Sequence, residues 1–414
     1  MDEIKPFMEA LLGLKDPWTL TRIEADLNAG QVDLYVDFLP GSRWPCPECG
    51  KGGCPVHDTV KRTWRHMNLF QYKTYVHARV PRVKCPDHGV RQVKVPWSRE
   101  GSGFTLLFES LAMSLVKFMP VREAALILDE WDTRIWRIVR HYVERSVEGQ
   151  DLSGLTSVGI DETSWKRRHR YLTVFMDLDT KRVVFVTPTR QKDTLKRFQD
   201  FLKAHNGNPG SVRHFSCDLS GTYAQGIREH FPHATVTADR FHLVKLVNDA
   251  VDAVRRMEQK RAGGLKRTRF LWLKNRGDLS VRERTHLEVL LDHPAYARMG
   301  RAHALKESFR DLFSMRPKEA EVNLKQWLHW ASHSRLSPMV KLARTFREQK
   351  SAILRWFSTR LSNGLLEGLN SLFQAARAKA RGYRSLKYGI LAFYLVGGRF
   401  EFQLPKFYAV THTK

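Results

Sequence analysis

Four acidic side chains in the sequence have the chemistry and the placement of a divalent-metal site. Asp161 interrupts the apolar run VGIDETS, Asp218 follows HFSC and Asp239 follows VTA, so each lies in or at the end of an expected strand. The fourth, Glu367, lies on an expected helix. Carboxylate oxygens are preferred ligands of hard cations such as Mg²⁺ and Mn²⁺, and two such ions catalyse in-line displacement at phosphorus. Together these residues favour a site that binds divalent cations, the kind of site that cutting and joining of DNA requires.

Each carboxylate taken alone has an ordinary explanation. An Asp at the end of a strand is more often a turn residue or a helix cap. Glu162, next to Asp161, has the alternative of pairing with a nearby Lys or Arg. The joint placement favours the metal site, because adjacent strand ends can converge on one spot at the edge of a sheet.

The helix expected over residues 363–380 separates its apolar and polar side chains. The apolar stripe comprises Leu365, Leu366, Leu369, Leu372, Phe373 and Ala376. The polar face, at helical spacing, comprises Asn363, Glu367, Asn370, Gln374 and Arg377. Between Gly368 and Arg399 the sequence has no acidic residue. A lone Glu367 beside this basic segment suits a metal ligand next to a phosphate backbone.

Two Cys/His pairs have the spacing of structural zinc knuckles. Cys46 and Cys49 form one pair, and Cys85 and His88 form the other, each with two residues between the ligands. Structural zinc needs four tetrahedral N or S ligands, and this spacing aims two of them from one turn. We expect these four residues to bind one Zn²⁺, because a β-hairpin between the pairs can bring them together.

The other cysteines leave alternatives open. Cys54 and His57 form a third pair with the same spacing, so the ligand set is not unique. The fifth cysteine, Cys217, lies far from the rest. An odd number of cysteines in a cytosolic chain suits a metal site better than a disulfide framework. Reduced cysteines without a metal are the remaining alternative.

The hydrophobic pattern predicts which elements position these residues. Residues 16–39 alternate around Asn28-Ala29-Gly30 and predict a β-hairpin, and WRHMNLF with YKTYVHARVPRVK predicts another. Residues 40–58 have the composition of a loop. From Phe104 the period becomes helical and predicts three helices, FTLLFESLAMSLVKF, VREAALILDE and TRIWRIVRHYVERSV.

The second and third of these helices, joined by a short turn, have the pattern of a helix-turn-helix. The apolar stripe of the third helix comprises Ile135, Trp136, Val139, Tyr142, Val143 and Val147. Arg134, Arg137 and His141 lie off that stripe, where a recognition helix contacts base edges in the major groove. An ordinary helical hairpin with a basic face fits the pattern equally well.

Beyond residue 150 the pattern becomes mixed and predicts a multidomain α/β protein. Strand and helix patterns alternate as in an α/β sheet, and then give way to basic helices over residues 243–358 and a final helix over 363–380. The expected segments are 1–98 (β and zinc module), 99–150 (helix-turn-helix), 151–244 (first part of the catalytic core), 245–358 (helical insertion) and 359–414 (last catalytic helix and tail).

The charge balance indicates a polyanionic partner. Lys and Arg number 69 against 43 Asp and Glu, a formal net charge of +26. A soluble protein with a basic surface is the plain alternative, and binding to a membrane surface is weaker because no single basic amphipathic helix dominates. No apolar run reaches 18 residues, and the N-terminus lacks the pattern of a signal peptide. We therefore expect a cytoplasmic protein.

The sequence resembles bacterial insertion-sequence transposases of the ISL-three family over nearly its whole length. The segments that carry the resemblance are CPECG, TWRHMNLFQYKTYVHARVPRVKCPDHGVR, VPWSREGSGFTLLFESL, VGIDETSWKRRHRYLT, CDLSGTYAQGI, ADRFHLVKLVNDAVDAVRR and NGLLEGLNSLFQAARAKARGYRS. The resemblance implies a zinc-binding module, a helix-turn-helix and an RNase H-like catalytic domain with a helical insertion. It implies a DDE triad of Asp161, Asp218 and Glu367, with Asp239 and His242 as neighbours. Some relatives have Cys where this chain has His88, and both residues bind zinc.

This interpretation predicts a transposase that binds double-stranded DNA, both the terminal inverted repeats of its element and the target. Mg²⁺ or Mn²⁺ at the triad would support cleavage and strand transfer, and a homodimer or larger assembly on DNA is expected in the bacterial nucleoid. Residues 255–270 and 377–387 would bind phosphates, the latter through Arg377, Lys379, Arg381 and Arg384. The alternatives are a non-catalytic DNA-binding regulator and a metal-dependent nuclease.

Overall fold

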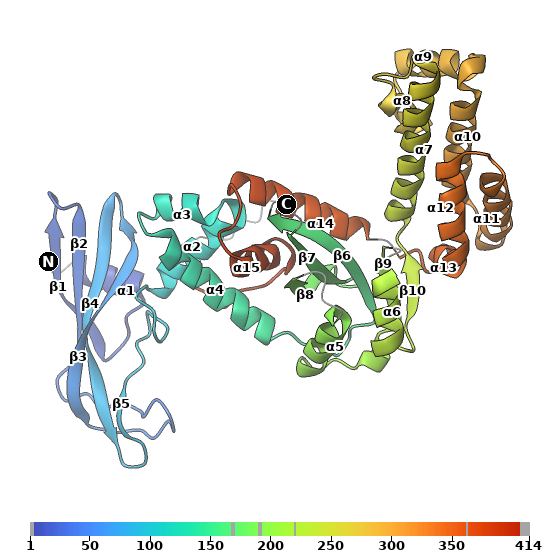
Figure 1. Ribbon diagram of the computed structural model, residues 1–414. Coiled ribbons are helices and arrows are strands. Elements are labelled where there is room, and N and C mark those ends of the chain that lie inside the picture. Colours follow the sequence, from blue (N-terminus) through green and yellow to red (C-terminus); the bar gives the residue numbers. More distant parts are fainter. Residues whose placement is uncertain (1–3, 167–169, 189–192, 219–220, 362, 406–414) are drawn as a thin grey trace. The chain divides into compact units, whose positions relative to one another are not determined.

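The computed structural model describes residues 4–166, 170–188, 193–218, 221–361 and 363–405 (Figure 1). The chain divides into two compact units, one containing Met1–Tyr142 with the segment from Glu401 onward, the other containing Val143–Phe400. Both contain helices and strands, so the protein is a multidomain α/β protein, as predicted. No helix among the described residues is long and apolar enough to cross a membrane.

The first unit is built on a five-stranded sheet. Its elements are α1 (Ile4–Leu12), β1 (Trp18–Asp26), β2 (Gln31–Phe38), β3 (Val56–Leu69), β4 (Tyr72–Cys85) and β5 (Gly89–Gln92). The strand order is β1-β2-β4-β3, with β5 on the free part of β4. Strands β1–β2 and β3–β4 form the two predicted hairpins.

Strand β3 begins earlier than predicted, inside the segment expected to be a loop. Asp58 pairs with Arg82 in the register of β3 and β4, and the two side chains form an ion pair. The Gly, Pro and Cys content of residues 40–58 is typical of a loop and does not predict a strand. The start of β3 forms by pairing with a segment more than 20 residues away, which local composition does not reveal. The first helix, α1, was also not predicted.

Three helices follow in the first unit, as predicted: α2 (Leu106–Phe118), α3 (Val121–Ile127) and α4 (Asp132–Glu148), the last of which continues into the second unit. The Thr105 hydroxyl accepts a hydrogen bond from the Phe108 amide and caps α2. Glu109 on α2 is fully buried, pairs with Arg99 and accepts a hydrogen bond from the Tyr142 hydroxyl on α4. This buried polar group fixes α2 against α4.

The second unit contains a mixed five-stranded sheet. Its strands are β6 (Ser157–Lys166), β7 (Arg170–Asp177), β8 (Arg182–Pro188), β9 (His214–Cys217) and β10 (Thr235–Ala238), in the order β10-β9-β6-β7-β8. Strands β6, β7 and β8 are antiparallel neighbours, whereas β9 is parallel to both β6 and β10. The strands expected at Asp161, Asp218 and Asp239 correspond to β6, β9 and β10.

Helices cover both faces of this sheet. Val158 and Ile160 on β6 share a buried core with Phe198 and Tyr223, which lie on α5 (Thr194–Ala204) and α6 (Gly221–His230). The other face carries α14 (Gly364–Lys379) and α15 (Leu386–Gly397).

The prediction that the helix over residues 363–380 is the last one is wrong, because α15 follows it. Leu391, Ala392, Phe393 and Tyr394 of α15 are all buried. A helix that is buried on most sides lacks the polar stripe by which an amphipathic helix is recognised in a sequence.

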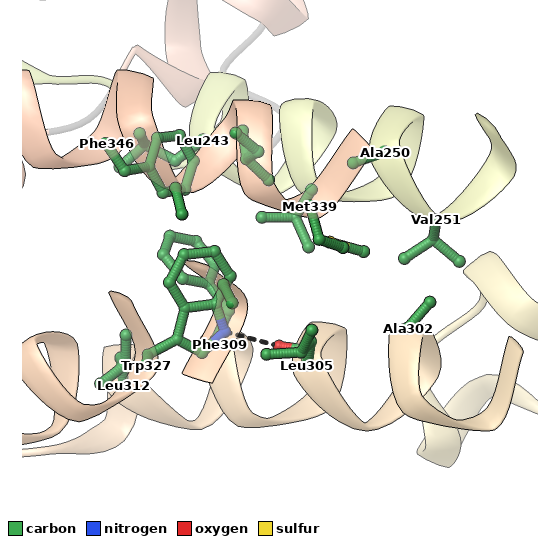
Figure 2. Close-up of a cluster of buried hydrophobic side chains, with 14 of the residues drawn as sticks. Leu243, Ala250, Val251, Ala302, Leu305, Phe309, Leu312, Trp327, Met339 and Phe346 are labelled. Carbon is green, nitrogen blue, oxygen red and sulfur yellow. Dashed lines mark hydrogen bonds between the residues drawn. The ribbon is translucent and has the colours of Figure 1, made fainter. Parts of the chain in front are cut away.

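Helices occupy the chain between β10 and α14, as predicted. They are α7 (Arg240–Ala262), α8 (Arg269–Leu273), α9 (Val281–Asp292), α10 (Ala297–Asp311), α11 (Pro317–Ser332), α12 (Ser337–Glu348) and α13 (Lys350–Thr359). Their core joins α7, α10, α11 and α12, with Phe309, Trp327 and Phe346 packed together (Figure 2). The Trp327 indole donates a hydrogen bond to the Leu305 carbonyl at 2.8 Å. These helices therefore share one hydrophobic core, which also includes Ala238 of β10.

Candidate functional site

The register of the second sheet places three aspartates in one row. In the register of β6 and β9, Gly159 pairs with Ser216, and Asp161 and Asp218 each lie two residues after this pair. In the register of β9 and β10, Cys217 pairs with Ala238, and Asp218 and Asp239 each directly follow this pair. Because residues in register on adjacent parallel strands lie side by side, the three aspartates occupy neighbouring positions, Asp161 within β6 and the other two directly after β9 and β10.

Helix α14 lays its polar face along β6. The Asn370 amide donates a hydrogen bond to Asp161 Oδ2 at 2.6 Å, and one turn later the Gln374 amide donates to Thr163 Oγ1 at 2.8 Å. Glu367, one turn before Asn370, lies on the same helix face. The polar face predicted from the sequence therefore faces the strand that carries Asp161.

Burial and like charges raise the pKa of two acids at this site, Asp161 and Glu367. Burial, together with the negative charges of Asp239, Asp218 and Glu162, raises the pKa of Asp161 to about 6, although the Glu162 amide opposes this shift. Burial and the charge of Asp239 raise the pKa of Glu367, against the weaker effect of Lys245. The carboxylates thus influence one another electrostatically.

The carboxylates are near one another without forming a compact ligand cage. Among the described residues, the carboxylates of this site do not form a group with the close ligand spacing of a bound metal. The donor set consists of hard oxygen ligands and carries excess negative charge, which fits Mg²⁺ or Mn²⁺.

Asp239 and His242 have a visible structural role. Asp239 is buried and caps the N-terminus of α7, where its Oδ2 accepts a hydrogen bond from the His242 amide at 3.1 Å. Its other oxygen accepts from the Asn363 amide at 3.2 Å. The cap explains why an acidic residue stands here, and its charge still acts on Asp161 and Glu367.

The raised pKa of Asp161 predicts that this residue destabilises the metal-free fold. Because its pKa rises from a usual 3.8 to about 6, the folded state binds more protons than the unfolded state between these values. The free energy of unfolding should therefore fall as the pH rises from 4 to 6. Asp161→Asn removes this cost, at most about 3 kcal/mol, and loses one accepted hydrogen bond, about 1 kcal/mol.

Urea unfolding without added Mg²⁺ or Mn²⁺, in chelator-free buffer so that the zinc site stays loaded, measures this effect. We expect Asp161→Asn to be more stable than the unaltered protein by about 1–2 kcal/mol at pH 7, with the difference shrinking as the pH falls towards 4. A variant that is less stable at pH 7 would refute the stated electrostatic cost.

The first unit contains a separate cluster with the geometry of a zinc site. Ligand atoms of Cys46, Cys49, Cys85 and His88 all lie within 4.8 Å of one another. The sulfurs of Cys49 and Cys85 are 3.8 Å apart, and Cys85 Sγ is 3.7 Å from His88 Nδ1. Two thiolates bound tetrahedrally at about 2.3 Å from zinc lie about 3.8 Å apart. The predicted hairpin of β3 and β4 does bring the two knuckles together.

The alternative knuckle does not join this cluster. Cys54 is buried nearby, and its sulfur contacts the Lys51 carbonyl at 3.5 Å. His57 lies on β3 and pairs with Asp58 instead. Burial opposes ionisation of Cys85, but hydrogen bonds from His88 and from nearby backbone amides lower its pKa to about 6. A low thiol pKa suits a metal ligand, because the thiolate is the form that binds.

The three predicted base-reading residues of α4 differ in their surroundings. Arg137 is exposed and makes no hydrogen bond or ion pair with the described part of the chain. Arg134 forms an ion pair with Glu130 at 2.6 Å and lies over the Phe104 ring at 4.3 Å. His141 is half-buried against Tyr142. Of the three, Arg137 is the most accessible to DNA.

The basic residues after Glu367 also differ. Arg377 donates hydrogen bonds to the carbonyl and the hydroxyl of Ser164 at 2.8 and 3.1 Å, so it also fastens α14 to β6. Lys379, Arg381 and Arg384 are exposed.

Two contacts next to the aspartates were not predicted. The Tyr223 hydroxyl donates to Glu162 at 2.7 Å, which gives Glu162 a neutral partner on the opposite face of the sheet from α14. The second is the contact between Asn370 and Asp161. The helical spacing of Asn370 from Glu367 predicted that both lie on one polar face, but it did not predict that this face contacts β6.

Comparison with known families agrees with this arrangement. Residues 158–392 match the family described as "Transposase", of the ISL3 DDE type. Residues 93–143 match the helix-turn-helix domain of transposase family ISL3. Residues 42–88 match the zinc-finger of transposase IS204/IS1001/IS1096/IS1165. The three matches contain β6–α15, the helix-turn-helix and the four-ligand cluster, respectively.

Whole-chain comparisons give the same result. The transposase for insertion sequence element IS1557 of Mycobacterium tuberculosis is 31% identical over 82% of each chain. The transposase for IS1001 of Bordetella parapertussis is 25% identical over 94% of this chain and 97% of its own length. Among solved structures, the Drosophila P element transposase strand transfer complex matches with a TM-score of 0.38 and 13% identity, over 72% of this chain and 92% of that one. The chain belongs to the ISL3 family of DDE-type transposases.

Proposed function

We propose that this chain is the transposase of an insertion sequence, which binds the terminal inverted repeats of its element, cleaves the DNA and transfers the free strand end into target DNA. The observation that carries the proposal is the row of Asp161, Asp218 and Asp239 at neighbouring positions of β6, β9 and β10, with α14, the helix of Glu367, packed on β6. Asp161, Asp218 and Glu367 are the proposed catalytic triad. A homodimer or larger assembly on DNA is part of the proposal, because an element has two ends.

We infer that the sheet of the second unit belongs to an RNase H-like core. Three antiparallel strands followed by two strands parallel to the first, in the order β10-β9-β6-β7-β8, support this inference. The helices α7–α13 then form an insertion between the last strand and the helix that carries Glu367. Because these helices follow the last strand, β10, the insertion does not interrupt the pairing of the strands.

In the proposed reaction, Asp161, Asp218 and Glu367 would hold divalent cations through their carboxylate oxygens. Such cations supply the positive charge that stabilises the entering and leaving oxygens of a phosphoryl displacement. With a pKa of about 6, Asp161 is mostly ionised at pH 7 and able to act as a ligand. The Glu162 amide and the Asn370 amide orient its two oxygens.

A DNA substrate that carries the labelled ends of the element tests the function. With Mg²⁺ we expect cleavage at the element end and products joined to target DNA. Cleavage without joining would instead identify a nuclease, and binding without cleavage would identify a DNA-binding regulator.

We also propose that the two units divide the recognition of DNA. The exposed Arg137 on α4 would contact base edges, whereas the exposed Lys379 and Arg381 would contact phosphates. Phosphate contacts release counterions, so each contributes about 0.9 to the slope of log K against log salt. Zn²⁺ bound by the four-ligand cluster would hold the loop of Cys46 and Cys49 against the end of β4, at the base of the β3–β4 hairpin.

Arg137→Ala is expected to reduce the preference for the element end over random DNA by about 1–3 kcal/mol. Replacing Lys379 and Arg381 by Ala should weaken binding to both DNAs alike and reduce the salt slope by about one to two. Arg377 is a poorer choice, because its loss would also disturb the contact with Ser164. Binding titrations at several salt concentrations on both DNAs measure these effects. A loss of preference in the Lys379 and Arg381 variant, with none in Arg137→Ala, would reverse the assignment.

A further inference from the structure

Asn363, the residue before α14, bridges two strands of the catalytic sheet. Its side chain is buried, with 5% of its surface exposed. The two hydrogens of its amide reach two carbonyl oxygens, Ile160 on β6 at 3.0 Å and Ser216 on β9 at 3.2 Å. One side chain therefore fixes the start of α14 to two neighbouring parallel strands.

The backbone of Asn363 makes two more contacts at the same junction. Its N–H donates to Asp239 Oδ1 at 3.2 Å, and the other oxygen of Asp239 caps α7. Its carbonyl accepts from the Glu367 amide at 2.9 Å, which closes the first turn of α14. Asn363 is thus bonded to β6, to β9, to the cap of α7 and to the residue proposed as the helical metal ligand.

These contacts lie next to the proposed metal ligands. Ile160 immediately precedes Asp161, and Ser216 lies two residues before Asp218. The two side-chain hydrogen bonds of Asn363 therefore hold the backbone near Asp161 and near Asp218. The first turn of α14, which starts at Asn363, holds Glu367. Misplacing a catalytic group by about 1 Å can lower a rate about 10²-fold.

Packing at this point is close enough to transmit that constraint. A Cβ added at Gly159 would lie 2.9 Å from Leu366 and 3.0 Å from Asn363 Oδ1, so α14 rests directly on the β6 backbone. Asn363 Oδ1 is buried and accepts no hydrogen bond within the described part of the chain. A buried acceptor without a partner costs free energy, which an apolar residue of similar size would avoid. An apolar side chain would lack the two N–H donors that bind the Ile160 and Ser216 carbonyls, and these donors are the reason for an Asn at this position.

We propose that Asn363 is a positioning residue, which sets the distance of Glu367 from Asp161 and Asp218 and so controls the affinity of the site for divalent cations. This inference rests on the proposed function. Residues that orient metal ligands change affinity or activity by about 10–100-fold when they are lost. Asn363 itself need not touch the cation or the DNA.

The test measures Mn²⁺ binding and end cleavage in the full-length Asn363→Leu variant. Free Mn²⁺ is quantified by its paramagnetic resonance signal, so one readout is independent of catalysis. We expect Mn²⁺ affinity at the carboxylate site to fall about 10–100-fold and the maximal cleavage rate to fall about 10²-fold. The Kd for the element end should stay unchanged, because the proposed DNA contacts, Arg137, Lys379 and Arg381, all remain in this variant.

Gln374→Leu is the matched control. Gln374 is another amide on the same helix that donates to β6, to Thr163 and to the Ser164 carbonyl, beyond the carboxylates. We expect this control to retain Mn²⁺ affinity within a few-fold of the unaltered protein. Equal losses in both variants would reveal general docking of the helix and overturn the proposal, as would unchanged Mn²⁺ affinity in Asn363→Leu.

Asn363→Ser covers the case in which the Leu variant does not fold. Serine suits the position before a helix, yet it is too short to reach both strands. The Ser variant should fold and show the same direction of change in Mn²⁺ affinity, and a normal affinity would overturn the proposal. If the unaltered protein neither binds Mn²⁺ at the carboxylates nor cleaves DNA, the proposed function fails instead.

Discussion

Asp161→Asn, Asp218→Asn and Glu367→Gln are each expected to lower cleavage of the element end by at least about 10³-fold, while binding to that end stays within a few-fold. An amide has nearly the shape of the carboxylate but lacks the negative charge that holds a divalent cation. The charge of the cation contributes several kcal/mol to the transition state of phosphoryl displacement. Binding persists because the exposed Arg137 lies on α4, outside the catalytic sheet.

Glu162→Gln is the matched control for these variants. Glu162 is adjacent to Asp161 on the same strand, but its carboxylate faces the other side of the sheet and accepts from Tyr223. We expect this variant to cleave within about tenfold of the unaltered rate, because it removes no proposed ligand. Single-turnover cleavage of a labelled end measures all four variants. If a triad variant cleaves at nearly the unaltered rate, that residue is not a catalytic ligand.

Removing the zinc ligands is expected to have the second large effect. Binding of structural zinc contributes about 10–16 kcal/mol in small zinc domains, which is comparable with the stability of a whole domain. Cys85→Ser removes one of four ligands at the base of the β3–β4 hairpin. We expect this variant to be purified without zinc, and its first unit to unfold at a lower temperature.

Cys54→Ser provides the control, since Cys54 is buried beside the cluster but outside it. Elemental analysis of chelator-free protein should give one zinc per chain in the unaltered protein and in Cys54→Ser. Finding no zinc in freshly purified protein would refute the site. Full retention in Cys85→Ser, with loss in Cys54→Ser, would move the site to the alternative knuckle.

Local patterns made most elements predictable. The alternation around Asn28-Ala29-Gly30 gave the first hairpin, and the apolar runs before Asp161 and Asp218 gave β6 and β9. The zinc ligands were predictable for the same reason, because the hairpin between the two knuckles is a local structure. Helix α15 escaped prediction because its buried sides carry no polar stripe.

Contacts between distant parts of the chain were not predictable. The polar face of α14 was visible in the sequence, but its partner strand lies about 200 residues earlier. Arg134 and Arg377 both looked like free basic residues, whereas the first is paired with Glu130 and the second is bonded to Ser164. A sequence gives the chemistry of a side chain, and only the fold gives its neighbours.

The most direct test of the account is to locate the divalent cation in the protein bound to its element end. Fe²⁺ substituted for Mg²⁺, with ascorbate and peroxide, cuts the polypeptide where the metal is held. We predict cuts beside Asp161, Asp218 and Glu367, which competing Mg²⁺ suppresses and which Asp161→Asn lacks. Cuts confined to other segments, in a complex that still cleaves DNA with Mg²⁺, would contradict the central claim that these carboxylates hold the catalytic cations.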